Sequence, residues 1–222
     1  MDKITTGNAA AKSGSSINAA VTEGSSPDVC RQMKTARNEG DLMMISPEAI
    51  HFMATRERGL ICMAITSERA DALELSPMVL QNTSWGGTAF PVSVDAKGRG
   101  ATTGISAYDR AQTVRAIVDA HTRPEDLARP GHIFPLGARR NGVLERRGHT
   151  ESAIDLARLA GLNPSGVICE IANDDGAMAC LPDLIRFCSK YALKMVSVAD
   201  LAQYRSGFAR RAVDASAVRL AG

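Results

Sequence analysis

Aromatic side chains and long apolar stretches are scarce in this sequence. Aromatic residues make up 4% of the 222 positions, and there is one tryptophan. No apolar run approaches the roughly 18 residues that a membrane-spanning helix requires, so we expect no membrane span. The first twenty residues lack the apolar segment of a secretory signal peptide, and a cytoplasmic location is therefore the default expectation.

A large excess of one charge and paired cysteines are also missing. The formal net charge of +2 is too small to indicate a nucleic-acid-binding protein. The five cysteines are odd in number and include no Cys-x-x-Cys pair. Reduced thiols are therefore favoured over disulfides and over a structural zinc site.

The length and composition fit one globular domain. Hydrophobic residues make up 45% of the chain, which is long enough to bury a sizeable core. Residues 1–27 are rich in small and polar side chains, which predicts a flexible tail with at most a short helix near residues 17–21. We infer that the domain itself covers residues 28–210 and that residues 211–222 form a second tail.

Capping and turn residues divide this domain into short elements. Predicted strands cover residues 60–65, 88–95, 133–136, 167–171 and 194–198, and predicted helices begin near residues 46, 106, 150, 182 and 200. The Pro- and Gly-containing residues 129–132 are expected to break the chain before the third strand. This order lacks a regular βαβ spacing. It indicates an α+β fold, a single-domain mixed sheet flanked by helices, rather than a doubly wound parallel sheet.

The stretch from Arg146 to Glu151 combines cations, a pliable backbone and an imidazole just before a helix. Thr150 is expected to cap that helix, and Gly161 to follow its end. Because the start of a helix attracts anions, the stretch predicts an anion site where a sugar phosphate could bind.

Five motifs, in this order, resemble those of the 3,4-dihydroxy-2-butanone 4-phosphate synthase family. They are Asn38-Glu39-Gly40-Asp41, Thr102-Thr103-Gly104-Ile105-Ser106-Ala107, Arg129-Pro130-Gly131-His132, the stretch from Arg146 to Glu151, and Cys169-Glu170 with Asn173-Asp174-Asp175-Gly176. The resemblance covers residues 38–205. It implies conversion of ribulose 5-phosphate to 3,4-dihydroxy-2-butanone 4-phosphate and formate in riboflavin biosynthesis. It also implies Mg²⁺ (or Mn²⁺), with two ions per site, and a homodimer whose active sites lie at the subunit interface. Some members carry a further GTP cyclohydrolase II domain, and because this chain ends at Gly222 a stand-alone synthase is expected.

The resemblance implies a role for each matching residue. His132 and Glu170 match essential acid/base groups, and His149 matches a metal ligand that also contacts substrate. The phosphate-side positions are Arg146, Arg147, Gly148 and Thr150, and the other substrate-side positions are Glu39, Asp41, Cys62 and Thr103. These residue types suit the chemistry, because an enediol needs proton transfer and a phosphate matches guanidinium groups and helix-start amides.

Each of these residues also has an ordinary structural interpretation. His132 could be a surface histidine in a turn, and His149 could cap a helix. Glu170 could pair with an arginine, Thr103 could belong to a turn, and Cys62 could be a small core residue. The functional interpretation depends on all the motifs occurring together and in order.

The chain departs from the family pattern at residues 33–37. Members usually carry Asp-Glu-Asp-Arg-Glu before Asn-Glu-Gly-Asp, whereas this chain carries Met33-Lys34-Thr35-Ala36-Arg37. Arg37 occupies the position of a carboxylate that would share the metal with His149, and a cation there repels a metal ion. The preceding Val29-Cys30-Arg31-Gln32 is polar where an apolar strand is expected.

Two alternatives follow from this departure. One is a catalytically silent paralogue that acts as a sugar-phosphate-binding or regulatory subunit. The other is a different sugar-phosphate lyase or isomerase that uses the same enediol step.

A compensated frameshift is our hypothesis for the origin of residues 33–37. The codons GAT GAA GAC CGC GAG AAC encode the family motif Asp-Glu-Asp-Arg-Glu-Asn. Reading the same bases from the second one gives Met-Lys-Thr-Ala-Arg.

Overall fold

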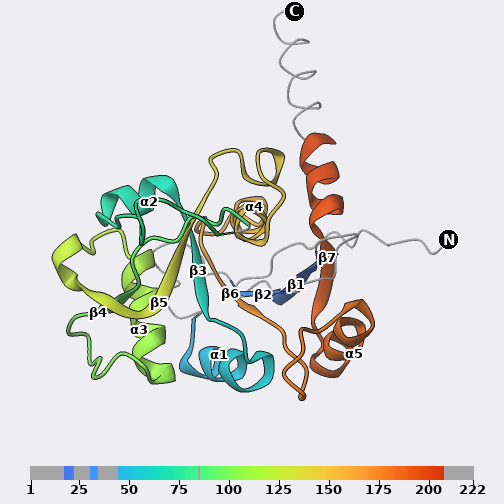
Figure 1. Cartoon of the computed structure of the whole chain (residues 1–222), viewed down its shortest axis with the longest axis horizontal. Coiled ribbons are helices and arrows are strands. Elements are labelled where there is room, and N and C mark those ends of the chain that lie inside the picture. The colour runs from blue at the N-terminus through green and yellow to red at the C-terminus, as the bar shows by residue number, and fades with distance from the viewer. Residues whose placement is uncertain (1–17, 23–30, 35–44, 85, 208–222) are drawn as a thin grey trace, which may run out of the picture.

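The structure is a computed structural model that describes residues 18–22, 31–34, 45–84 and 86–207 (Figure 1). The strands are β1 Asn18–Thr22, β2 Arg31–Lys34, β3 Cys62–Thr66, β4 Val94–Ala96, β5 Leu127–Ala138, β6 Gly166–Glu170 and β7 Lys194–Ser197. The helices are α1 Pro47–Phe52, α2 Ser67–Ala72, α3 Ala107–Val118, α4 His149–Leu159 and α5 Leu181–Tyr191, followed by a helix over residues 198–207. A π-helical turn, Met53–Glu57, continues α1, and short 3₁₀ turns occupy Pro124–Asp126 and Gly142–Leu144.

One mixed seven-stranded sheet organises these elements, in the order β4-β5-β3-β6-β2-β1-β7. The pairs β3–β5 and β1–β7 are parallel, and the other neighbours are antiparallel. This arrangement confirms the predicted α+β fold with a mixed sheet flanked by helices.

Helices cover both faces of the centre of the sheet, because its side chains alternate between two cores. On β3, Met63 packs with α1 and α3, while the adjacent Cys62 packs with Ile154 of α4. On β6, Cys169 and Ile168 divide in the same way. Figure 1 shows α4 and α1 on opposite sides of the sheet. The face under α4 is the one that carries the candidate site.

The helix starts with strong local signals are confirmed. Ser46 Oγ accepts a hydrogen bond from Ala49 N at the start of α1, with Pro47 as the first helical residue. Ser106 Oγ accepts one from Asp109 N at the start of α3. α5 begins at the predicted place near residue 182.

Two predicted helix starts are wrong by a few residues. Gly148, not Thr150, precedes α4 as its N-cap, and Thr150 lies inside the first turn. The last helix begins at residue 198 rather than at Asp200, because Ser197 Oγ accepts the hydrogen bond from Asp200 N. The end of α4 is as predicted, since Gly161 follows it with a φ of 68°.

Two strand predictions also need correction. Within residues 88–95 only the end becomes β4, because Pro91 has no N–H to donate and the segment makes just an isolated bridge to Pro77. The predicted break at residues 129–132 does not occur, and β5 runs through it. Pro130 is tolerated because it falls at an irregularity in the β4 pairing and before the pairing with β3 begins at Phe134.

The helix expected near residues 17–21 is wrong, because β1 occupies residues 18–22 and pairs with β2 and β7. Strand β2 forms between β1 and β6 although its sequence is polar. The domain limits at residues 28 and 210 stay predictions. None of the helices in the described residues combines the length and the hydropathy needed to cross a bilayer.

Candidate functional site

The candidate acid/base residues His132 and Glu170 lie at the same end of the sheet. Strands β5 and β6 flank β3, and Phe134 and Ile168 both pair with Cys62. His132 precedes Phe134 by two residues, and Glu170 follows Ile168 by two. Neighbouring strands are about 4.8 Å apart, so the two backbones lie about 10 Å apart. Residues two apart on a strand share a face, which here is the face under α4.

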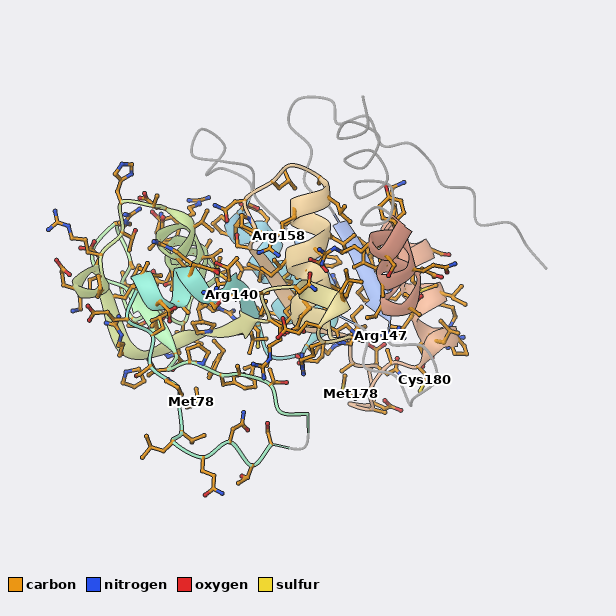
Figure 2. All side chains as sticks on the ribbon, turned by 90° about the horizontal axis from the view of Figure 1, so that it is seen from above. Met78, Arg140, Arg147, Arg158, Met178 and Cys180 are labelled. Carbon is orange, nitrogen blue, oxygen red and sulfur yellow. The ribbon has the colours of Figure 1, made fainter. Side chains whose placement is uncertain are left out.

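The start of α4 reaches this same end. Only residues 160–165 join α4 to β6, so the helix and the strand run antiparallel. The first residue of α4, His149, therefore lies toward the end of β6, where Glu170 is. In Figure 2, Arg147 lies on the same side of the molecule as Met178, which follows β6. The fold thus brings an imidazole, a carboxylate and a helix start to one edge.

The His132 ring is held by Asp95, a residue of β4. Asp95 Oδ2 lies 2.7 Å from His132 Nδ1, and Asp95 Oδ1 accepts a hydrogen bond from His132 N at 2.9 Å. The His132 side chain is 42% exposed, whereas Asp95 is 14% exposed. Gly104, with a φ of 87°, packs against both side chains, and a Cβ there would overlap Asp95 Oδ2 and His132 Nδ1.

The loop that carries Gly104 is fixed by the buried carboxylate of Asp109. Asp109 accepts hydrogen bonds from Thr102 N, Thr102 Oγ1 and Gly104 N. Burial raises the pKa of Asp109, but the hydrogen bonds from Thr102 and Gly104 outweigh it, so the pKa lies below its ordinary value. Thr103 is exposed beside Gly104, and the loop therefore presents it near His132.

We expect Asp109→Asn to lower the midpoint of thermal unfolding at pH 7, because an amide has one acceptor oxygen for three donors. A lowered carboxyl pKa stabilises the fold above the unfolded-state pKa of about 3.9, and this contribution is lost as the pH falls through the folded-state pKa. Thermal unfolding at pH 7 and at pH 3 measures the gap between wild type and variant. The gap should be large at pH 7 and smaller at pH 3.

Asp175→Asn is the matched control, since Asp175 also accepts a backbone N–H, from Ala177, but in an exposed turn. It should unfold like the wild type at both pH values. An Asp109→Asn gap that is equally large at pH 7 and pH 3 would contradict the role assigned to the carboxylate.

Glu170 is oriented by the chain just before β3. Leu60 N donates a hydrogen bond to Glu170 Oε2 at 2.9 Å. Gly59 lies so close to the Glu170 backbone that a Cβ would crowd it. The neighbouring Cys169 is buried, and burial together with the charges of Glu57 and Glu170 raises the pKa of its thiol. Cys169 therefore stays a thiol, and the acid/base role of Glu170 in this motif stays a prediction.

The start of α4 holds Arg146 against the buried carboxylate of Glu151. Arg146 Nη1 donates to Glu151 Oε2 at 2.8 Å, and Arg146 Nη2 donates to Gly86 O at 3.0 Å. Glu151 Oε1 also accepts from Arg139 N. Arg146 Nη2 also donates to Thr88 Oγ1 at 3.3 Å, so the guanidinium is fixed on the loop before α4.

The other predicted residues of this stretch differ in burial. Gly148, His149 and Thr150 are buried, with 8% of His149 and 3% of Thr150 exposed. Arg147 is exposed on the surface (Figure 2). Their assignment to phosphate binding stays a prediction.

A second buried carboxylate anchors the segment that leads into α4. Asp155 Oδ2 accepts hydrogen bonds from Val143 N and from Arg205 Nη1, both at 2.8 Å. Arg205 belongs to the helix over residues 198–207 and also donates to Asn141 O. Residues 141–143 are thereby tied to α4 and to the C-terminal helix. These contacts fix the position of the chain just before Arg146.

A Mg²⁺ ion takes about six oxygen ligands, usually including one or two carboxylates. The structure describes no group of three or more His, Cys, Asp or Glu side chains that could hold a metal ion. His149 would supply one imidazole, and at position 37, where the family resemblance implies a carboxylate, this chain has an arginine. The described residues alone therefore do not fit a magnesium centre.

Of three further predicted substrate-side residues, one lies in the core and two lie outside the described residues. Cys62 is 1% exposed and packs in the core under α4, as its ordinary interpretation expected. Its substrate role stays a prediction. Glu39 and Asp41 lie outside the described residues, as does Arg37.

Sequence reasoning missed Asp95 and the pairing of Arg146 with Glu151. Asp95 was placed only as the end of a strand, and nothing local indicates that a bulge turns it toward His132. Glu151 lies in the first turn of α4, and its carboxylate reaches back five residues to the guanidinium of Arg146. Neither contact has a sequence spacing that a local rule predicts.

A separate cavity of about 320 Å³ lies at the other end of β3. Ile65, Thr66, Arg69, Ile117, Pro164 and Ser165 contribute to its lining. It carries no histidine and is remote from the edge that bears His132 and Glu170, so it is not part of the candidate site.

Comparison with known proteins gives a consistent set of matches. The model of the family described as 3,4-dihydroxy-2-butanone 4-phosphate synthase matches residues 17–204. A 3,4-dihydroxy-2-butanone 4-phosphate synthase of Agrobacterium fabrum is 56% identical over 174 residues, which cover 77% of this chain and 81% of that protein. The riboflavin biosynthesis protein RibBA of Aquifex aeolicus is 57% identical over 173 residues, which cover 76% of this chain but 43% of the relative. The chain thus spans less than half the length of that relative.

Solved structures match the fold as well. A 3,4-dihydroxy-2-butanone 4-phosphate synthase crystallised in complex with two magnesium ions has a TM-score of 0.78 and 34% identity, covering 87% of this chain and 92% of that one. The two-domain synthase RibBX of A. baumannii has a TM-score of 0.76 and 43% identity, covering 86% of this chain and 54% of that one.

Proposed function

We propose that this chain, which belongs to the 3,4-dihydroxy-2-butanone 4-phosphate synthase family, converts D-ribulose 5-phosphate to L-3,4-dihydroxy-2-butanone 4-phosphate and formate. This is a lyase reaction of riboflavin biosynthesis. The observation that carries the proposal is the meeting of His132, Glu170 and the start of α4 at one edge of the sheet.

His132 and Glu170 act as the acid/base groups that transfer protons. The sugar must lose a proton from the carbon next to its carbonyl, which gives an enediol. The His132 ring is held through Nδ1, so Nε2 is the atom that can exchange a proton with the sugar. The Glu170 carboxylate accepts a hydrogen bond from Leu60 N, which orients it at this edge of the sheet. The two groups, about 10 Å apart by strand spacing, suit a small sugar lying between them.

The later steps break carbon bonds without any redox partner. Loss of water from the enediol, migration of one carbon and expulsion of formate convert five carbons to four plus one. The water lost in the dehydration is taken up again when formate leaves, so the atoms balance. The phosphate stays on the four-carbon product, and its binding at Arg146 and the helix start would hold the sugar in place throughout.

The proposal extends to metal, assembly and location. Divalent Mg²⁺ or Mn²⁺ would stabilise enediol charge when bound, and a solved relative in complex with two magnesium ions supports metal use. The proposal also includes ribulose 5-phosphate as the substrate, a homodimer with interface active sites and a cytoplasmic location, and its support for these is the family resemblance. The chain's own residue for the metal would be His149.

The silent paralogue differs from this proposal in its prediction for turnover. Arg37 is the observation in its favour, because a cation replaces the family's metal-binding carboxylate. None of the relatives named above is described as catalytically silent. The synthase therefore remains the function with more support.

Formate release from ribulose 5-phosphate with Mg²⁺ tests the proposal, alongside calorimetric binding of the same sugar. We expect binding and formate release that is abolished by a chelator and by His132→Gln. Binding without any formate, in this chain and in one whose residues 33–37 are restored to the family motif, would favour the silent paralogue.

A further inference from the structure

We infer that Asp95 is a positioning residue for His132, which it holds in the tautomer that leaves Nε2 unprotonated toward the substrate. The inference rests on the proposed function for the identity of the reaction. The contact itself is independent of that function, since it is made by the two side chains alone.

Asp95 contacts His132 through both of its carboxylate oxygens. One carboxylate oxygen accepts the backbone N–H of His132 at 2.9 Å, and the other lies 2.7 Å from ring Nδ1. A carboxylate has only acceptor oxygens, so Nδ1 must carry the proton that joins them. The neutral ring then has its lone pair on Nε2, which is the state needed to remove a proton from a sugar carbon.

The contact between Asp95 and His132 lies at an irregularity in the pairing of β4 with β5. β4 pairs Val94 with Ile133 but Asp95 with Ala128, so residues 129–132 of β5 are passed over at a bulge. The Asp95 backbone pairs with Ala128, and at this bulge its carboxylate contacts His132. Gly131 permits it, because a Cβ there would overlap the backbone of Val94. Gly131 N is in turn bound by Ser93 Oγ at 3.2 Å.

A third element closes over the pair. Gly104 lies against Asp95 Oδ2 and His132 Nδ1, leaving no room for a side chain. The buried Asp109 fixes this loop through Gly104 N. The carboxylate is thus shielded to 14% exposure while the ring stays 42% exposed. An exposed ring on a shielded carboxylate is the arrangement expected when the free ring nitrogen must meet a ligand.

A second Asp–His pair in the chain shows the contrast. Asp119 also accepts the backbone N–H of a histidine, His121, and lies 3.3 Å from its Nδ1. The His121 ring is 85% exposed, about twice the exposure of the His132 side chain. This pair supplies the matched control, because it has the same chemistry without the site.

The test is Asp95→Asn in the full chain, read by long-range ¹⁵N–¹H NMR of labelled histidine at a pH where the ring is neutral. His132→Gln identifies the His132 signal among the four histidines. In the variant the amide oxygen is needed by His132 N, so its NH₂ faces Nδ1 and the ring proton moves to Nε2. We expect the Nδ1–H tautomer in the wild type and the Nε2–H tautomer in Asp95→Asn.

Kinetics give the second readout. Asp95→Asn should lower kcat for formate release about 10²-fold or more, with KM changed less than about 3-fold, because the wrong tautomer cannot accept the proton. In a His132→Gln background the same change should cost almost nothing further. Asp119→Asn should leave turnover unchanged. The activity arm uses the chain as it stands or, if that chain is inactive, the chain with residues 33–37 restored.

The outcomes distinguish a failure of the positioning role of Asp95 from a failure of the proposed reaction. An Nδ1–H tautomer that persists in Asp95→Asn, or an equal loss of kcat with and without His132, overturns the positioning role. Tautomer exchange without any formate release from either chain leaves Asp95 as the residue that sets the ring and overturns the proposed reaction instead.

Discussion

Restoring the family motif at residues 33–37 is expected to raise formate release from ribulose 5-phosphate by about 10²-fold or more. The changes are Met33→Asp, Lys34→Glu, Thr35→Asp, Ala36→Arg and Arg37→Glu. The physical reason is charge at one position. A cation at 37 repels a divalent ion, whereas a carboxylate there gives His149 an oxygen partner for the metal. Initial rates at saturating sugar and Mg²⁺ measure the gain.

Two single variants separate the causes of that gain. Arg37→Gln removes the repelling charge without adding a ligand, and Arg37→Glu does both. A large gain from Arg37→Glu and a small one from Arg37→Gln would identify coordination as the missing element. No gain from restoring residues 33–37, in a chain that still binds ribulose 5-phosphate, would contradict the metal explanation and favour the silent paralogue.

The origin of the altered sequence at residues 33–37 can be tested separately. Resequencing the gene across codons 20–40 shows whether a shift by one base recovers the acidic motif. Codons that cannot be shifted into Asp-Glu-Asp-Arg-Glu would eliminate the frameshift hypothesis and leave residues 33–37 as an ordinary substitution.

His132→Gln and Glu170→Gln are expected to lower kcat by about 10²- to 10⁴-fold each in whichever form of the chain turns over. Glutamine at 132 keeps a polar side chain without a titrating ring. Glutamine at 170 still offers Leu60 N an acceptor oxygen, so the local fold is retained. Steady-state formate release, with thermal unfolding to confirm that the variants fold, measures the effect.

Surface residues of the same types serve as controls for these two variants. His121→Gln changes a histidine that is 85% exposed, and Glu125→Gln changes a glutamate that is 66% exposed. Both should turn over like the parent chain. A His132→Gln or Glu170→Gln variant that keeps more than about a tenth of the parent kcat would remove that residue from the acid/base pair.

Local signals in the sequence predicted those parts of the fold that local chemistry decides. The starts of α1 and α3 follow from Ser46 and Ser106, whose hydroxyls accept the hydrogen bonds of the first turn. The end of α4 follows from Gly161, which adopts a positive φ. The α+β class followed from the order of strands and helices, and the family from motifs that keep their order.

Contacts between distant segments decided the rest. β1 forms because β2 and β7 offer it partners, although its small polar residues suggested a tail. β5 passes through Pro130 because a bulge opposite Asp95 removes the need for a ladder hydrogen bond there. The Asp95–His132 contact joins residues 37 positions apart, and no spacing rule reaches that far. His132 itself was identified from its motif, but the group that orients it was not.

The central claim is that this edge of the sheet performs the family's carbon-expelling reaction, and product analysis by NMR tests it most directly. The chain with restored residues 33–37 is incubated with uniformly ¹³C-labelled ribulose 5-phosphate and Mg²⁺, and all carbon-containing products are quantified in one sample. We predict formate and a four-carbon methyl ketone phosphate in equal amounts. An isomeric pentose phosphate without formate would contradict the account, because it would mean that the enediol is formed but only reprotonated.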